Sequence, residues 1–108
     1  MSTRLVRRIL RRLVKVAGMT AWGRAQVKVI DGDEAVGQGW GRGVSGFQMM
    51  KESHVSVHTL ADEGVIFIDF FSCREWDTNL GKELQRIIKP ARAWMQTVDR
   101  HLEPQPGL

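Results

Sequence analysis

Residues 43–73 read GVSGFQMMKESHVSVHTLADEGVIFIDFFSC, and most of the predicted sheet lies in this stretch. It contains three segments of strand length, residues 44–50, 54–60 and 64–71, rich in β-branched and aromatic side chains, which predicts three strands. Residues 61–64 (ADEG) separate the last two segments and predict a hairpin connection. The third segment is apolar at almost every position, which predicts a central strand buried on both faces.

The residues before this stretch predict a fourth strand. Residues 26–30 (QVKVI) are β-branched and alternate in polarity, and the Asp-Gly-Asp sequence at 31–33 predicts a turn after them. Residues 35–42 are rich in glycine, and Gly37, Gly39, Gly41 and Gly43 lie at every second position, a pattern that fits a strand with one bare face as well as a loop.

Two helices flank the predicted strands. From Thr3 to Ala17 the apolar residues form one stripe, with Ser2 or Thr3 suited to start the helix and Gly18 to end it. A second helix is expected after Asp77-Thr78, with Pro90 kinking or splitting it near Lys89. Its expected core positions are Leu80, Leu84, Ile87, Ile88, Trp94, Met95, Val98 and Leu102. The order of the elements predicts an α+β two-layer sandwich, an antiparallel sheet of about four strands packed by two helices.

Length and composition indicate one domain, residues 1–108. The formal net charge is +4, but residues 1–28 hold eight basic side chains and no acid, so the remainder carries −4. Such a basic end suits an anionic partner, nucleic acid or membrane, or charge pairing within an assembly. No apolar run is long enough to span a bilayer, and no secretory signal is expected. The lone cysteine, Cys73, excludes an internal disulfide and a multi-cysteine metal cage.

Three short motifs lie within residues 43–73: G-V-S-G at residues 43–46, E-S-H-x-x-x-H-T at 52–59 and D-x-F-x-C at 69–73. Each motif alone is weakly informative. In this order and spacing they resemble the S-adenosylmethionine decarboxylases of bacteria and archaea. The resemblance covers residues 43–73, with a looser match in the helix that follows.

The resemblance implies a self-cleaving enzyme. Members of the family cut themselves between glutamate and serine, here Glu52 and Ser53, which would give chains 1–52 and 53–108. Ser53 would then become a covalent pyruvoyl group, the cofactor for decarboxylation. By correspondence, Ser45 and His58 supply the hydrogen-bond donor and the base for cleavage, and Cys73 returns a proton to the substrate. The implied role is in polyamine (spermidine) biosynthesis, with S-adenosylmethionine as substrate.

The sequence departs from the family where the family binds its nucleoside. A tryptophan that follows the second histidine in the family is Leu60 here, and a ribose-binding glutamate position holds Asp62. Upstream, Gly39-Trp40-Gly41 replaces a Phe-x-Pro segment, so Trp40 is the remaining candidate to stack on a base. Asp62 and Glu63 would also suit a guanidinium or ammonium group, which leaves arginine or ornithine as alternative substrates. A non-catalytic relative that binds nucleic acid or a partner through the basic helix is a further alternative.

Strand geometry adds one constraint to the implied site. In a regular strand Ser53 and His58 point to opposite faces of the sheet, so we expect a bend or break at Ser53 that brings them together. A hydrolase triad of Ser53, His58 and Asp69 lacks the G-x-S-x-G elbow. A metal site at His54 and His58 is disfavoured, because side chains at this spacing on a strand lie roughly 13 Å apart.

The expected partners and location follow from the same resemblance. We expect a small-molecule substrate and a homodimer or larger homo-oligomer. We expect no metal, no membrane and, for the decarboxylase, no nucleic acid. A lone thiol fits the reducing cytoplasm, which is the predicted location.

Overall fold

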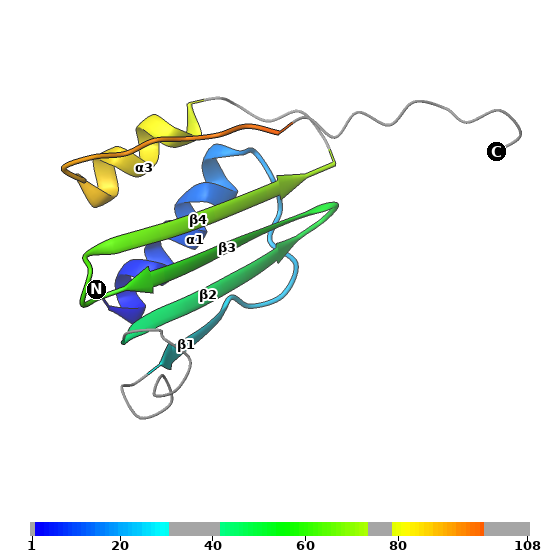
Figure 1. Cartoon of the computed structure of the whole chain (residues 1–108). Helices are drawn as coiled ribbons and strands as arrows, with labels where there is room; N and C mark the ends of the chain where they lie inside the picture. The colour runs from blue at the N-terminus through cyan, green and yellow to red at the C-terminus, as the bar shows by residue number, and fades with distance from the viewer. Residues whose placement is uncertain (1, 31–41, 74–78, 99–108) are drawn as a thin grey trace, which may run out of the picture.

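The part of the chain that the structure describes forms an open antiparallel sheet with two helices on one face (Figure 1). The computed structural model describes residues 2–30, 42–73 and 79–98. In chain order the elements are α1 (Thr3–Val16), β1 (Gln26–Ile30), β2 (Gly43–Met50), β3 (Ser53–Leu60), β4 (Val65–Ser72) and α3 (Leu80–Ile88). The strands lie in the order β1-β2-β3-β4, each antiparallel to its neighbour. The predicted α+β class, with about four strands and two helices, is confirmed.

Helix α1 begins and ends at the residues that its sequence indicates. The Ser2 hydroxyl accepts a hydrogen bond from the Leu5 amide at 3.1 Å, which satisfies one of the unpaired donors of the first turn. At the other end Gly18 takes a positive φ of 67°, and the Met19 amide donates back to the Val14 carbonyl. This is the Schellman arrangement that glycine permits most easily. Neither described helix is long and apolar enough to cross a bilayer.

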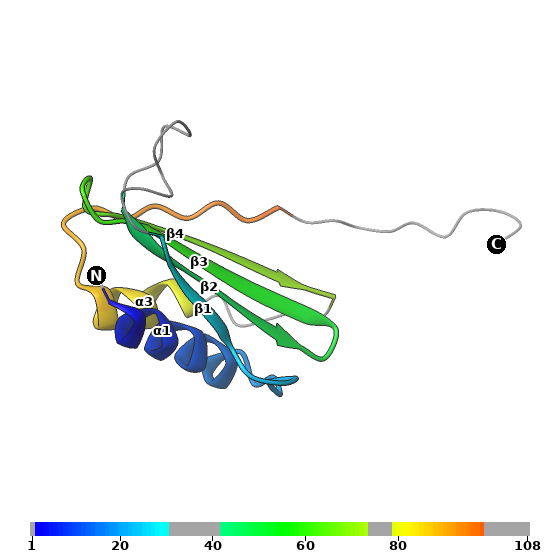
Figure 2. The same ribbon diagram turned by 90° about the horizontal axis from the view of Figure 1, so that it is seen from below.

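Figure 2 shows both helices beneath the same face of the sheet. The apolar stripe of α1 supplies half of the core and the sheet supplies most of the rest. The buried apolar side chains are Val6, Ile9, Leu10, Leu13, Val14, Val44, Met50, Val55, Val57 and Leu80. Strand residues alternate between this face and the opposite one, which no described element covers. We call that opposite surface the open face.

Gly46 allows α1 to lie close against β2. A β-carbon built at Gly46 would lie 2.5 Å from Val6 Cγ1 and 3.0 Å from Leu10 Cδ1. Both neighbours are fully buried, so neither side chain has free space into which it could move.

We therefore expect Gly46→Val to destabilise the protein by about 1–3 kcal/mol through overpacking. Chemical denaturation of both proteins checks this. Gly64→Ala is a contrasting control, since a β-carbon there meets nothing within 4 Å and any cost comes from its positive φ. Equal stability of Gly46→Val and the wild type would contradict the close approach of α1.

Three sequence-based expectations are wrong. β4 is an edge strand of the described sheet rather than a central one, and Phe67 is 56% exposed. The interruption expected near Lys89 is observed, since α3 ends at Ile88 with Lys89 in the left-handed conformation ahead of Pro90, but no helix continues through residues 91–98. Trp94, Met95 and Val98 are consequently exposed instead of buried. β3 has no break between Ser53 and His58.

Some expectations concern residues outside the described part of the chain. These are the turn at 31–33, most of the glycine-rich segment 35–42, the helix start at Asp77-Thr78, and Leu102.

Candidate active site

The β2–β3 hairpin places the Glu52–Ser53 peptide at one end of the sheet. Met50 pairs with Ser53, so Lys51 and Glu52 form a two-residue turn. Glu52 adopts a φ of 65° there, and only one other described non-glycine residue, Lys89, has a positive φ. A left-handed non-glycine residue costs on the order of 1–3 kcal/mol and persists only where its surroundings hold it. The backbone is therefore strained immediately before the peptide that the sequence motif marks.

The end of β4 holds both sides of this peptide. The Cys73 amide donates a hydrogen bond to the Glu52 carbonyl oxygen at 3.1 Å. The Ser53 hydroxyl, on a residue only 6% exposed, donates to the Ser72 hydroxyl at 3.2 Å. The carbonyl and the hydroxyl of adjacent residues are thus both held by two consecutive residues, the last residue of β4 and the residue that follows it.

Ser45 and His58 form a pair on the open face. They are direct partners in the β2–β3 register, and Ser45 Oγ lies 2.9 Å from His58 Nδ1. Thr59 follows His58 in β3 and points to the helix-facing side of the sheet. Its hydroxyl accepts a hydrogen bond from the Val44 amide at 2.8 Å and donates one to the Val44 carbonyl at 3.3 Å. These contacts lock the G-V-S-G segment to the H-T segment.

Two of these residues were not identified from the sequence. Thr59 belongs to the quoted motif, and strand alternation places it on the buried face, where a hydroxyl needs a partner. Its structural role could have been inferred from that signal. Ser72 gave no comparable signal, because its importance depends on the β3–β4 register, which the sequence does not fix.

Within one chain the two groups do not meet. Ser53 lies on the helix-facing side at the start of β3, whereas His58 is exposed on the open face five positions later. That separation along a strand is about 16 Å. The structure therefore brings together Glu52, Ser53 and Cys73 at one end of the sheet, and Ser45 and His58 toward the other.

The open face carries an aromatic cluster between these two ends. The His54 ring lies between those of Phe47 and Phe71, with centroid separations of 5.6 and 5.1 Å and interplanar angles of 29° and 18°. Met49 and Phe67, on the same face, are 46% and 56% exposed. A patch of this kind on a sheet face is typical of an interaction surface.

Two of the three predicted substrate-binding residues, Asp62 and Glu63, are described, and both lie near the end of β3 that carries His58. Asp62 and Glu63 are exposed in the turn between β3 and β4, which closes with Gly64 at a positive φ of 65°. Trp40 lies outside the described residues.

Other sites suggested by the residues find little support. Asp69 pairs with Ser56 in the register and alternates onto the open face, away from the Ser53 hydroxyl, so one chain assembles no Ser-His-Asp triad. Among the described residues no three His, Cys, Asp or Glu side chains gather in a metal-binding group.

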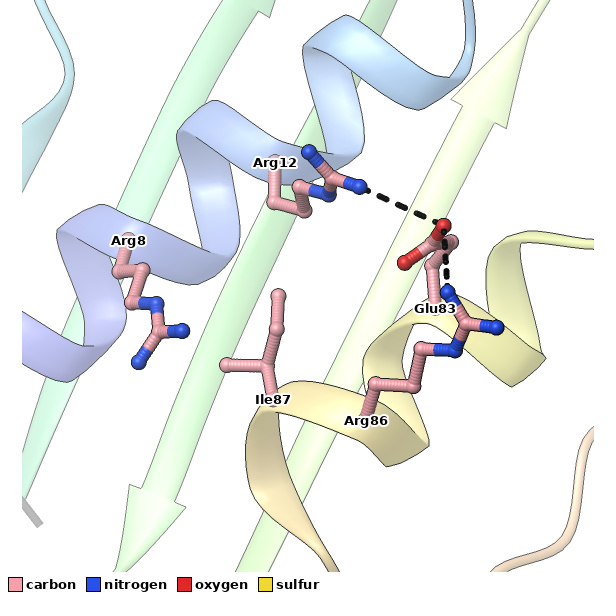
Figure 3. Close-up of a pocket in the computed structure, with 5 residues that line it drawn as sticks. All are labelled: Arg8, Arg12, Glu83, Arg86 and Ile87. Atoms are coloured by element: carbon pink, nitrogen blue, oxygen red, sulfur yellow. Dashed lines mark hydrogen bonds and ion pairs between the residues drawn. The ribbon is translucent and has the colours of Figure 1, made fainter.

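A surface hollow between α1 and α3 is lined by Arg8, Arg12, Glu83, Arg86 and Ile87 (Figure 3). Glu83 accepts contacts from both Arg12, at 3.4 Å, and Arg86, at 3.7 Å. The Glu83 carboxylate already occupies the point where these two guanidinium groups converge, so no further anion is expected to bind between the two groups. The Arg12–Glu83 ion pair links α1 to α3.

The fold and the hairpin define a class: an α+β domain whose chemistry centres on a strained Glu–Ser peptide, with a serine–histidine pair on its open sheet face. The sequence profile of S-adenosylmethionine decarboxylase matches residues 1–101. The chain belongs to the S-adenosylmethionine decarboxylase family, whose members are pyruvoyl-dependent enzymes made by self-processing. The resemblance inferred from the three motifs is confirmed.

Two curated relatives support the same family. Both are named S-adenosylmethionine decarboxylase proenzyme and come from Methanococcus maripaludis, strains C7 and S2. They are 33% identical over 63 residues and 30% identical over 61 residues, in each case 55% of this chain and 50% of the relative. The matched region thus spans about half the length of these relatives. No solved structure gives a significant match.

Proposed function

We propose that the chain is the precursor of a pyruvoyl-dependent decarboxylase that cuts itself between Glu52 and Ser53. The products are chains 1–52 and 53–108, and Ser53 becomes the pyruvoyl group. The observation that carries the proposal is the conformation of the hairpin, in which the left-handed Glu52 precedes Ser53. The Ser53 hydroxyl is held by Ser72 at the end of β4, and the Glu52 carbonyl is held by the Cys73 amide just after it. Family membership supports the same chemistry.

The residues at the hairpin suit the first step of cleavage. Ser53 Oγ attacks the Glu52 carbonyl carbon, the Glu52–Ser53 carbon–nitrogen bond breaks, and the hydroxyl proton passes to that nitrogen, leaving an ester. Negative charge develops on the Glu52 carbonyl oxygen during the attack. The Cys73 amide already donates to that oxygen, which is the placement that an oxyanion donor needs.

The second step removes the Ser53 α-proton and releases the Glu52 carboxylate, so that hydrolysis then leaves a ketone and ammonia. A base is needed for the proton, and His58, oriented by Ser45, is the candidate. The resulting ketone accepts electron density while carbon dioxide leaves the substrate. Cys73 is exposed beside the cleavage point, where its thiol is suited to return a proton to the substrate.

We further propose that the serine–histidine pair acts on the hairpin of a second copy. The pair and the hairpin lie toward opposite ends of β2 and β3, and the open face between them carries the aromatic cluster beside the polar residues Ser56 and Asp69. If two open faces stack around a two-fold axis perpendicular to the strands, the His58 end of each copy lies over the Glu52 end of the other. Such an isologous dimer would complete two equivalent sites and cover the aromatic cluster. Asp62 and Glu63 of one copy would then border the site of the other. We propose these two residues and Trp40 as the substrate-binding residues.

The substrate that we propose is S-adenosylmethionine, with a role in polyamine biosynthesis. The family and the names of both relatives favour it over arginine or ornithine, and they likewise disfavour a non-catalytic nucleic-acid-binding protein. We also propose a cytoplasmic location, which the free Cys73 thiol suits.

Release of labelled carbon dioxide by the purified protein tests the substrate. We expect release from carboxyl-labelled S-adenosylmethionine, and none from labelled arginine or ornithine under the same conditions. Borohydride, which reduces the ketone, should abolish the activity. Turnover of arginine or ornithine alone would contradict the substrate assignment but leave the cleavage chemistry standing.

A further inference from the structure

Ser72 is the last residue of β4, and its hydroxyl contacts the group that would attack the peptide. We propose that Ser72 is the positioning residue for the Ser53 hydroxyl in self-cleavage, and that it acts in the first step, formation of the ester. This inference rests on the proposed function and assigns a role to a residue other than those that the family resemblance implies, which are Ser45, Ser53, His58 and Cys73.

The β3–β4 register places Ser72 directly opposite Ser53. The two hydroxyl oxygens are 3.2 Å apart, with Ser53 donating. Ser53 is 6% exposed and Ser72 is half-buried, so bulk water is a poor substitute for the lost acceptor if Ser72 is changed. The contact therefore limits the rotation of the Ser53 hydroxyl in the folded precursor.

The neighbouring residue fixes the other reacting group. The Cys73 amide donates to the Glu52 carbonyl oxygen at 3.1 Å, so Ser72 and Cys73 together hold nucleophile and target in one relative position. Reactions between groups held in this way are faster, because folding has already met the entropy cost of bringing the two groups together. The strain at Glu52 and the two contacts from β4 act on the same peptide.

The chemistry assigns Ser72 an acceptor role. As Ser53 Oγ bonds to the Glu52 carbonyl carbon and its proton leaves for the Ser53 nitrogen, an accepting hydroxyl increases the electron density on Oγ and keeps a lone pair directed at the carbon. Ser72 ends the step with its own proton, so no outside reagent is required. Removal of the α-proton in the second step does not involve the Ser72 hydroxyl.

Ser72→Thr and Ser72→Val test the proposal at nearly constant side-chain shape. Threonine keeps the hydroxyl, so we expect cleavage near the wild-type rate; valine lacks it, and a lost hydrogen bond of this kind predicts cleavage about tenfold slower. Fresh full-length precursor is followed by intact mass. Thr3→Val, which removes an exposed hydroxyl at the start of α1 and keeps the side-chain shape, is the matched control and should cleave normally.

Hydroxylamine separates this role from a general structural one, because it cuts an ester but leaves an amide intact. We expect hydroxylamine to leave Ser72→Val slow, since the variant is delayed before the ester forms. Equal rates for the valine variant and the wild type would overturn the inference, as would rapid cutting of the valine variant by hydroxylamine. If the threonine variant is as slow as the valine variant, the hydroxyl is not responsible and the inference also fails. A wild-type chain that never cleaves would instead refute the proposed function itself.

Discussion

Replacing His58 by alanine is expected to slow self-cleavage by roughly 10²–10⁴-fold, the usual contribution of a positioned general base. His58 is exposed on the open face, and its described hydrogen bond is with Ser45, so the substitution should leave the hydrophobic core unchanged. The expected product is an intact chain that melts near the wild-type temperature. Cleavage followed by intact mass, together with a thermal melt, measures both effects.

The same variant should stop at the ester, because its missing base acts on the Ser53 α-proton. Hydroxylamine should therefore cut His58→Ala between residues 52 and 53, in contrast to its lack of effect on Ser72→Val. The Ser53→Ala chain cannot form the ester and serves as the negative control. Cleavage of His58→Ala at the wild-type rate would remove the serine–histidine pair from the mechanism.

Mixing two inactive variants is expected to restore cleavage. In a dimer of His58→Ala with Ser53→Ala, the first copy supplies an intact Glu52–Ser53 peptide and the second supplies an intact Ser45–His58 pair. Random exchange of subunits at equal concentration places about half of the His58→Ala chains in mixed dimers, so about half of them should be cut. The intact mass of each chain shows which of the two is cleaved.

The physical reason for this result is the distance within one chain. Ser53 and His58 lie on opposite sides of an unbroken strand, about 16 Å apart along it, so a single copy offers no route for proton transfer between them. A mixture that remains uncut, although native mass spectrometry shows mixed dimers, would contradict action between copies. Cleavage by monomers at a rate independent of concentration would contradict it as well.

Local sequence patterns were sufficient to predict most of the framework. The alternation in residues 26–30 and 54–60, the turn residues at 61–64 and the apolar stripe of α1 each predicted an element that the structure contains. Ser2 and Gly18 cap α1 as expected, because capping depends on side chains close in sequence.

The errors concern properties that depend on distant parts of the chain. The apolar sequence of β4 indicates burial on both faces, but its position at the edge of the described sheet follows from strand order. Trp94 and Val98 continue a helical spacing, yet the left-handed Lys89 and the proline after it end the helix first, and both side chains are exposed.

For the candidate site, the alternation of side chains along a regular strand predicted the positions of Ser53 and His58 correctly, whereas the expected break in the strand did not occur. Alternation places Ser53 and His58 on opposite faces, as observed. The strain lies instead at Glu52, in the turn before the strand begins, so β3 needs no break to contain a distorted cleavage point. The role of Ser72 could not be inferred from the sequence, because it depends on how β3 pairs with β4.

The intact mass of the purified wild-type chain, measured beside Ser53→Ala, shows whether the chain cuts itself between Glu52 and Ser53. We expect two wild-type fragments, residues 1–52 and a chain that starts with a pyruvoyl group at position 53, and a single uncut Ser53→Ala chain. A wild-type preparation that decarboxylates its substrate while every molecule keeps the Glu52–Ser53 peptide whole would contradict self-cleavage at this peptide.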